Sequence, residues 1–135
     1  MPSFLQRFRA RAILPEDAPE QNLSALGLPL DTVETDLQVA RYGGYGKTVI
    51  GLAWDQYNDG KLDDAIGNTS VLIEDTNLQR SPKYTLILGA AHYLRGLAFQ
   101  EKADYGQARA NFQSALKLVP EYELARRALA RLQRR

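Results

Sequence analysis

A glycine-rich stretch is the part of the chain whose residue types come nearest to chemistry. The run from Gly43 to Thr48 (GGYGKT) ends like a phosphate-binding loop, in which a lysine and a hydroxyl group meet phosphate and magnesium. The complete pattern needs a glycine six residues before Lys47, where Arg41 stands, and a buried strand before the loop. Residues 35–40 (TDLQVA) are too polar for such a strand. We therefore interpret the glycines as a separator between two helices, with nucleotide hydrolysis as the weaker alternative.

Other candidate catalytic or metal-binding groups are sparse. His92 is the single histidine and lies in an apolar run, where a histidine is more often packed or groove-lining than a ligand. Asp55 and Asp59 flank a turn without the spacing of a calcium loop, which favours a solvated turn and helix capping. The chain has no cysteine, which excludes disulfides, thiolate catalysis and cysteine zinc sites. We expect no enzyme activity, no cofactor and no metal site.

Length and composition suit one globular domain. The 135 residues are 44% hydrophobic and 24% charged, with a net charge of +1 that argues against a nucleic-acid binder. The most apolar run, residues 84–99, contains Arg95 and is shorter than the about 20 residues of a membrane span. The N-terminus lacks the apolar core of a signal peptide. We expect a cytoplasmic protein.

Small residues recur at helical spacing between Gly96 and Pro120. Ala108 and Ala115 lie seven residues apart on one helix face, and Phe112 lies between them. Gly96 is small enough to let this second helix approach closely, and residues 104–106 form a tight connection. Pro120 ends the second helix. The stretch therefore predicts a close-packed helical hairpin.

The order Gly96, Phe99, Ala108, Phe112, Ala115 and Pro120 resembles the tetratricopeptide repeat (TPR), a helical hairpin of about 34 residues. A degenerate earlier copy begins at residues 51–54 (GLAW), turns at residues 58–60 and continues through Ala65. Its second helix carries a stripe of Ile66, Thr69, Leu72 and Ile73. The linker, residues 78–83, ends in Ser81-Pro82, which predicts the cap and first turn of the following helix.

The resemblance implies an all-α fold, a right-handed superhelical stack of about two hairpins with a C-terminal capping helix. We divide the chain into an N-terminal arm with a short helix, residues 1–44, and the helical domain, residues 45–135. Asp31 and Glu34 predict a short helix near residues 31–42. The preceding arm is either disordered alone or draped on a partner, and it or a second protein covers the first repeat.

The final helix, predicted over residues 121–133, has an apolar stripe of Tyr122, Ala125, Leu129 and Leu132. Arg126, Arg127, Arg131 and Arg134 lie mostly off this stripe. This pattern favours a solvating cap. The alternative is a basic patch for an acidic partner, phosphate or membrane surface.

TPR proteins hold a partner segment in a concave groove lined by the first helix of each repeat. By this resemblance the partner-binding residues are Tyr45, Thr48, Leu52, Asp55, Tyr93, Leu97, Gln100 and Glu101. Thr48, Leu52, Tyr93 and Leu97 stand where one TPR subgroup has a carboxylate clamp, so an apolar peptide or helix is the expected ligand. The two tyrosines are equally compatible with burial beneath the N-terminal arm.

Two functions of different classes follow. The first is an adaptor or assembly factor that binds another protein transiently through the groove. The second is a permanent structural subunit of a larger complex. A peripheral contact with a membrane complex, through the arm or the basic helix, is part of that second expectation.

Overall fold

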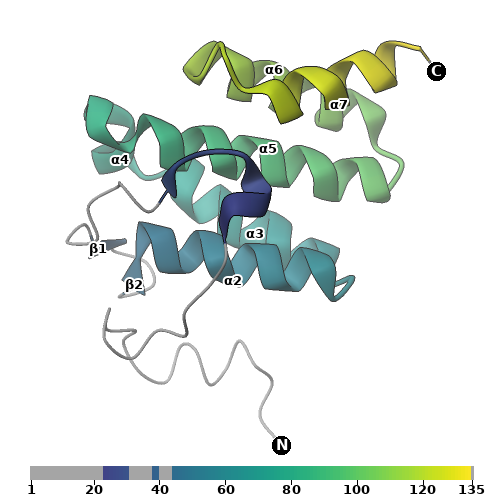
Figure 1. Cartoon of the computed structure of the whole chain (residues 1–135). Helices are drawn as coiled ribbons and strands as arrows, with labels where there is room; N and C mark the ends of the chain where they lie inside the picture. The colour runs from purple at the N-terminus through teal and green to yellow at the C-terminus, as the bar shows by residue number, and fades with distance from the viewer. Residues whose placement is uncertain (1–22, 31–37, 40–43, 135) are drawn as a thin grey trace, which may run out of the picture.

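The computed structural model describes residues 23–30, 38–39 and 44–134, and these are predominantly helical (Figure 1). The elements are η1 (Leu23–Leu26), α2 (Gly46–Asn58), α3 (Leu62–Ile73), α4 (Thr76–Arg80), η3 (Pro82–Tyr84), α5 (Thr85–Glu101), α6 (Tyr105–Leu118) and α7 (Glu123–Gln133). The predicted helical fold is therefore confirmed.

One pair of very short strands precedes α2. Strand β1 (Gln38–Val39) pairs antiparallel with β2 (Gly44–Tyr45), with Gln38 opposite Tyr45. The helix predicted near residues 31–42 is therefore wrong at residues 38–39, and the rest of that range lies outside the described residues. A β-branched valine and an aromatic residue fit a pleated pair better than a helix, and the neighbouring glycines disfavour helix continuation.

The first hairpin, α2 and α3, turns where the sequence predicts. Gly60 has φ +79°, and the amide of Lys61 bonds to the carbonyl of Gln56 at 2.8 Å. The predicted stripe on α3 is partly wrong, because Ile66 and Ile73 are only half-buried. Thr69 and Leu72 of that stripe are buried as predicted, and Ala65 and Asn68 are buried in place of the two isoleucines.

The linker between the hairpins is itself structured. Asp75 caps α4 by accepting from the amides of Asn77 and Leu78, and Leu78 is buried. Ser81 and Pro82 stand at the cap and first position of the helical turn η3, as predicted, but Ser81 makes no side-chain cap bond and the α-helix α5 itself begins at Thr85. The turn η3 leads directly into α5, and its last residue, Tyr84, is buried.

The second hairpin, α5 and α6, is packed as closely as its small residues predict. A Cβ placed on Gly96 would lie 2.6 Å from Cε1 of Phe112. Asp104 caps α6 by accepting from the amide of Gln107 at 3.2 Å, and α6 ends at Leu118, two residues before Pro120.

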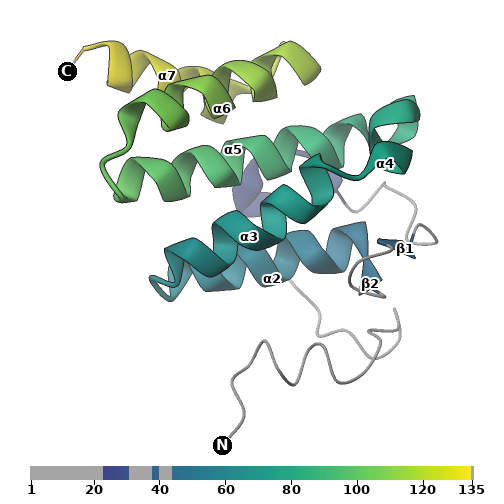
Figure 2. The ribbon, with the colours of Figure 1, turned by 180° about the vertical axis from the view of Figure 1, so that it is seen from behind.

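The helices form two layers. Figure 1 shows α2, α5 and α7 in the near layer, and Figure 2 shows α3 and α6 on the opposite side. Helix α3 packs on both α2 and α5, whereas α6 packs on α5 and α7. The final helix starts at Glu123, two residues later than predicted, and buries Ala125, Ala128 and Leu132, while Tyr122 is buried just before it. Leu129 of the predicted stripe is only half-buried. The turn η1 crosses the outer side of the near layer in front of α5 (Figure 1).

Candidate binding face

The outer side of the near layer, which we call the α2–α5–α7 face, carries most of the residues predicted to bind a partner. Residues 23–30 lie against part of it. Leu26 and Leu30 are 0% and 1% exposed, and the hydroxyl group of Tyr122 donates a hydrogen bond to the Leu26 carbonyl oxygen. Part of the predicted groove is therefore occupied by the chain itself.

The predicted partner-binding residues divide by exposure. On α2, Leu52 is buried, Thr48 is half-buried and Asp55 is exposed. On α5, Tyr93 is buried, whereas the remaining three are half-buried or exposed: Leu97, Gln100 and Glu101. The side chain of Tyr45 lies outside the described residues. Leu52 and Tyr93 thus line the interior of this face and do not offer a free surface.

Tyr93 belongs to an aromatic cluster under the face. Its ring centroid lies 5.1 Å from that of Tyr122 and 5.9 Å from that of Phe112. Burial raises the pKa of Tyr93, and the positive charge of Arg131 partly opposes this shift. Of the two alternatives for this tyrosine, groove or core, the structure places it in the core.

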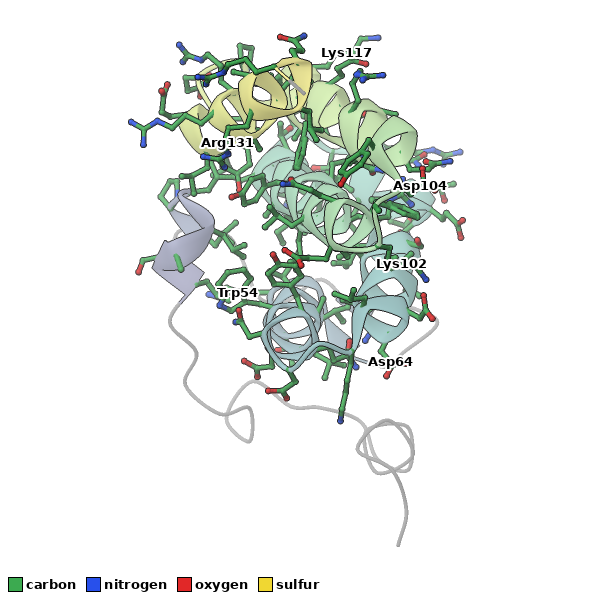
Figure 3. All side chains as sticks on the ribbon, turned by 90° about the vertical axis from the view of Figure 1, so that its right-hand side faces the viewer. Trp54, Asp64, Lys102, Asp104, Lys117 and Arg131 are labelled. Carbon is green, nitrogen blue, oxygen red and sulfur yellow. The ribbon has the colours of Figure 1, made fainter. Side chains whose placement is uncertain are left out.

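The C-terminal ends of α2 and α5 leave part of the face uncovered. We call Trp54, Tyr57, Leu97, Gln100 and Glu101 the open end of the face. The rings of Trp54 and Tyr57 stack with centroids 5.8 Å apart and an interplanar angle of 16°. Burial, followed by the charge of Glu101, raises the pKa of Tyr57, so this carboxylate acts on the tyrosine from α5. Trp54 projects from α2 toward η1, and Arg131 projects from α7 on the same side (Figure 3).

Gln100 contributes an unusual polar atom to this end. Its Oε1 atom is buried and has no hydrogen-bond partner within the described part of the chain. A buried acceptor without a partner is costly and is normally satisfied by a donor. The open end therefore combines two stacked aromatic rings and a carboxylate with a buried amide oxygen that has no donor among the residues that the structure describes.

Two parts of this face were missed by the sequence interpretation. Trp54 and Tyr57 are three residues apart in a helix, a spacing that places side chains side by side and could have revealed the pair. Alternating leucines at positions 26, 28 and 30 were also a signal of a segment with one apolar side.

A separate polar network joins three helices away from this face. Arg95 donates from Nε to Oδ1 of Asn111 at 2.8 Å and from Nη1 to Oγ of Ser70 at 3.0 Å. Nδ1 of His92 lies 3.1 Å from the same Oδ1. Because arginine can only donate, Oδ1 is the acceptor, and Nδ1 of His92 must carry the proton of the neutral ring. Burial lowers the pKa of His92. This histidine is a structural link between α5 and α6.

The charges of α7 are partly neutralised by its own first turn. Glu123 pairs with Arg126 at 2.8 Å and with Arg127 at 3.2 Å. The arginines of this helix are exposed, as the sequence pattern indicates. This exposure is compatible with both predicted roles of α7, the solvating cap and the basic patch.

The glycine-rich stretch leads directly into α2. Lys47 and Thr48 lie in the first turn of this helix. The preceding strand β1 has two residues and pairs antiparallel with β2 of the stretch itself. This geometry differs from a phosphate-binding loop, which follows a central strand of a sheet. Within residues 23–30, 38–39 and 44–134, no group of three or more metal-ligating side chains comes together.

Comparisons of the chain with models of known families, with curated proteins and with solved structures gave no match. No helix in the described ranges combines the length and apolar character that crossing a membrane requires.

Proposed function

We propose that the chain is a non-enzymatic protein-interaction module of the TPR type, acting as an adaptor or assembly factor. In this proposal α2–α3 and α5–α6 are two hairpins of a right-handed superhelical stack, and α7 caps it. The order of contacts supports the proposal, since α3 packs on both α2 and α5 and the two first helices also touch. Repeat proteins are built from such nearest-neighbour contacts.

The observation that carries the binding proposal is that the α2–α5–α7 face already accommodates a short peptide segment. Residues 23–30 bury leucines against it, and Tyr122 bonds to a main-chain carbonyl of that segment. Surfaces that bind peptides use main-chain hydrogen bonds for affinity and side-chain pockets for specificity. The half-buried Trp54 and Tyr57 add aromatic anchors of the kind enriched at interfaces. The proposed ligand is an apolar peptide or helix of another protein.

Site-specific photo-crosslinking in the source cells tests this proposal. A photoreactive amino acid at Trp54 should crosslink to a defined segment of one partner protein, identified by mass spectrometry. The matched control carries the same amino acid at Lys117, which is exposed on α6 (Figure 3). Equal crosslinking from both positions, or crosslinking from position 117 alone, would contradict binding at the face.

A permanent structural subunit is the second candidate, and one observation favours it. Residues 23–30 already cover part of the face, and a subunit does not need an open groove. In such a complex, the exposed arginines of α7 would supply a peripheral contact with a larger or membrane-associated assembly. Hydrogen exchange on the isolated chain distinguishes the candidates. Protection throughout α2 to α7 favours the adaptor, whereas loss of protection without a partner favours the subunit.

A further inference from the structure

We infer that residues 23–30 are an exchangeable occupant of the α2–α5–α7 face, and that the partner's segment has the same leucine–glycine chemistry and replaces them. This inference rests on the proposed function and names both the class of partner and the regulation of the site. We call residues 23–30 the cis segment.

The cis segment is apolar on one side only. Leu26 and Leu30 are buried, and Leu23 and Leu28 are half-buried, whereas the residues between them are exposed: Ser24, Ala25, Gly27 and Pro29. A segment in the middle of a core would be enclosed on all sides. This one lies on a surface, with one side in contact and the other in solvent, as a bound peptide does.

Its shape is specified at one residue. Gly27 has φ +78°, and a Cβ at this position would lie 2.7 Å from Cδ1 of Leu124. Residues with a side chain rarely adopt this backbone conformation, and here the space is also filled. Beyond the turn, a Cβ on Gly89 of α5 would lie 3.9 Å from Cδ1 of Leu28. A competing segment therefore needs a glycine between its leucines.

The segment depends on the face for its conformation. The amide of Gly27 bonds to the carbonyl of Ser24 at 2.9 Å, and the amide of Leu30 bonds to the carbonyl of Leu28 at 2.8 Å. Single turns of this kind are not stable in water by themselves. Segments with few internal bonds open more readily than the helices that they cover. Release of the cis segment therefore breaks fewer backbone hydrogen bonds than opening one of the long helices beneath it.

The open end supplies a place where a partner binds before exchange. Trp54 projects toward η1, so a partner chain anchored on this residue lies next to the cis segment (Figure 3). A tethered segment competes at an effective concentration on the order of millimolar. The partner's apparent affinity equals its intrinsic affinity multiplied by the fraction of molecules whose face is uncovered. The cis segment therefore favours a partner that binds both Trp54 and the part of the face that the cis segment covers.

A peptide-binding experiment on the full chain tests exchange. The probe is a fluorescent peptide with the sequence of residues 21–31, and binding is followed by fluorescence anisotropy. The full-length variant with Leu26→Ala and Leu30→Ala, whose cis segment is weakened, should bind the probe at least about tenfold more tightly than the unmodified chain. The Ala25→Ser variant, altered on the exposed side, should bind no more tightly than the unmodified chain.

A second probe separates specific exchange from general apolar adsorption. The same peptide with Gly27→Val cannot adopt the turn and should lose at least about tenfold in affinity for the weakened variant. Equal binding of both peptides, or no binding to a weakened variant that keeps its helical circular dichroism, would overturn the inference. A dimer seen by light scattering, and abolished by Gly27→Val in the chain, would assign the segment to exchange between copies instead.

Hydrogen exchange on the unmodified chain keeps the test decisive if the double variant does not fold. The amides of Gly27 and Leu30 should exchange at least about tenfold faster than those in the middle of α5. Equal protection would mean that the segment is a permanent part of the core. Peptide exchange without any crosslink from Trp54 would show that residues 23–30 are exchangeable, but it would contradict a protein partner at the face and with it the proposed function. A crosslink without peptide exchange would support the proposed function and overturn the inference.

Discussion

At the residue scale, Gly96 determines how closely α5 and α6 approach. A methyl group at this position would meet the ring of Phe112, which is fully buried and lies against Tyr93. We expect Gly96→Ala to lower the free energy of unfolding by about 1–3 kcal/mol, because the ring has no space to move into. Urea denaturation measures this change.

Gly67 provides the matched control for that substitution. It also lies within a helix, but a Cβ there would meet no atom within 4 Å. Gly67→Ala should therefore stabilise the protein by up to about 1 kcal/mol, through helix propensity alone. Equal effects at both positions would mean that α5 and α6 are not in close contact.

His92 makes stability depend on pH. Burial lowers its pKa below 6.5, the bond to Asn111 partly opposes this, and the charge of Arg95 lowers it further. The unfolded chain therefore binds a proton on His92 more readily than the folded chain does. The contribution of the neutral ring to the free energy of unfolding is complete above pH 6.5. It is lost as pH falls from 6.5 through the lower pKa of the folded state.

His92→Gln removes the titrating group and serves as the comparison. Urea denaturation of both proteins between about pH 7.5 and 5 should show a smaller loss of stability in the variant, because only the unmodified chain must charge a buried ring. Parallel curves of stability against pH for the two proteins would show that His92 does not contribute to the pH dependence of stability.

At the element scale, α6 has one face for packing and one for solvent. Ala108 is completely buried, whereas Ala110 is exposed on the same helix. We expect Ala108→Arg to destabilise the protein by at least about 3 kcal/mol, since it buries a charge without a partner. Ala110→Arg should change stability by less than about 0.5 kcal/mol. Thermal unfolding measures both, and similar values would contradict the orientation of α6.

A buried amide pair holds α2 against α3. Nδ2 of Asn68 donates to Oε1 of Gln56 at 2.6 Å, and both side chains are buried. Asn68→Leu should cost about 1–3 kcal/mol, because it leaves Gln56 without this donor. Replacing both residues by leucine should recover part of that loss. A double variant that loses the sum of both single effects would argue against the pair.

At the scale of the whole molecule, Tyr122 connects the two ends of the described chain. Its hydroxyl group bonds to the carbonyl of Leu26, 96 positions earlier in the sequence. Tyr122→Phe should lower stability by about 1–3 kcal/mol and speed exchange at the Gly27 amide, because the Leu26 carbonyl loses its donor. Arg127→Glu, on the exposed side of α7, should leave unfolding almost unchanged. Unchanged exchange at Gly27 in the tyrosine variant would contradict this role.

Elements with strong local signals were predicted well. The α5–α6 hairpin follows from small residues at helical spacing, from the Asp104 cap and from Pro120, all of which act within a few residues. The turn before α3 follows in the same way from Gly60. These features concern short stretches of chain, so the sequence alone carries them.

Elements whose conformation depends on packing were predicted poorly. The 3-10 turn η3, in which Tyr84 is buried, precedes α5, and Ile66 is only half-buried on α3, which packs against both α2 and α5. Strand β1 occupies residues for which the local capping pattern favoured a helix. Contacts with distant elements decide such cases, and local propensity is weak against them.

The sequence by itself determined where the two hairpins turn and that small side chains let their helices pack closely. Only the tertiary structure decided which residues of the α2–α5–α7 face are accessible. Leu26 and Leu30 reach this face from a segment far from α5 and α7 in sequence, and they cover part of it while Trp54 stays at the open end. Helical periodicity reports which side of a helix a residue occupies, but not which distant segment lies on that side.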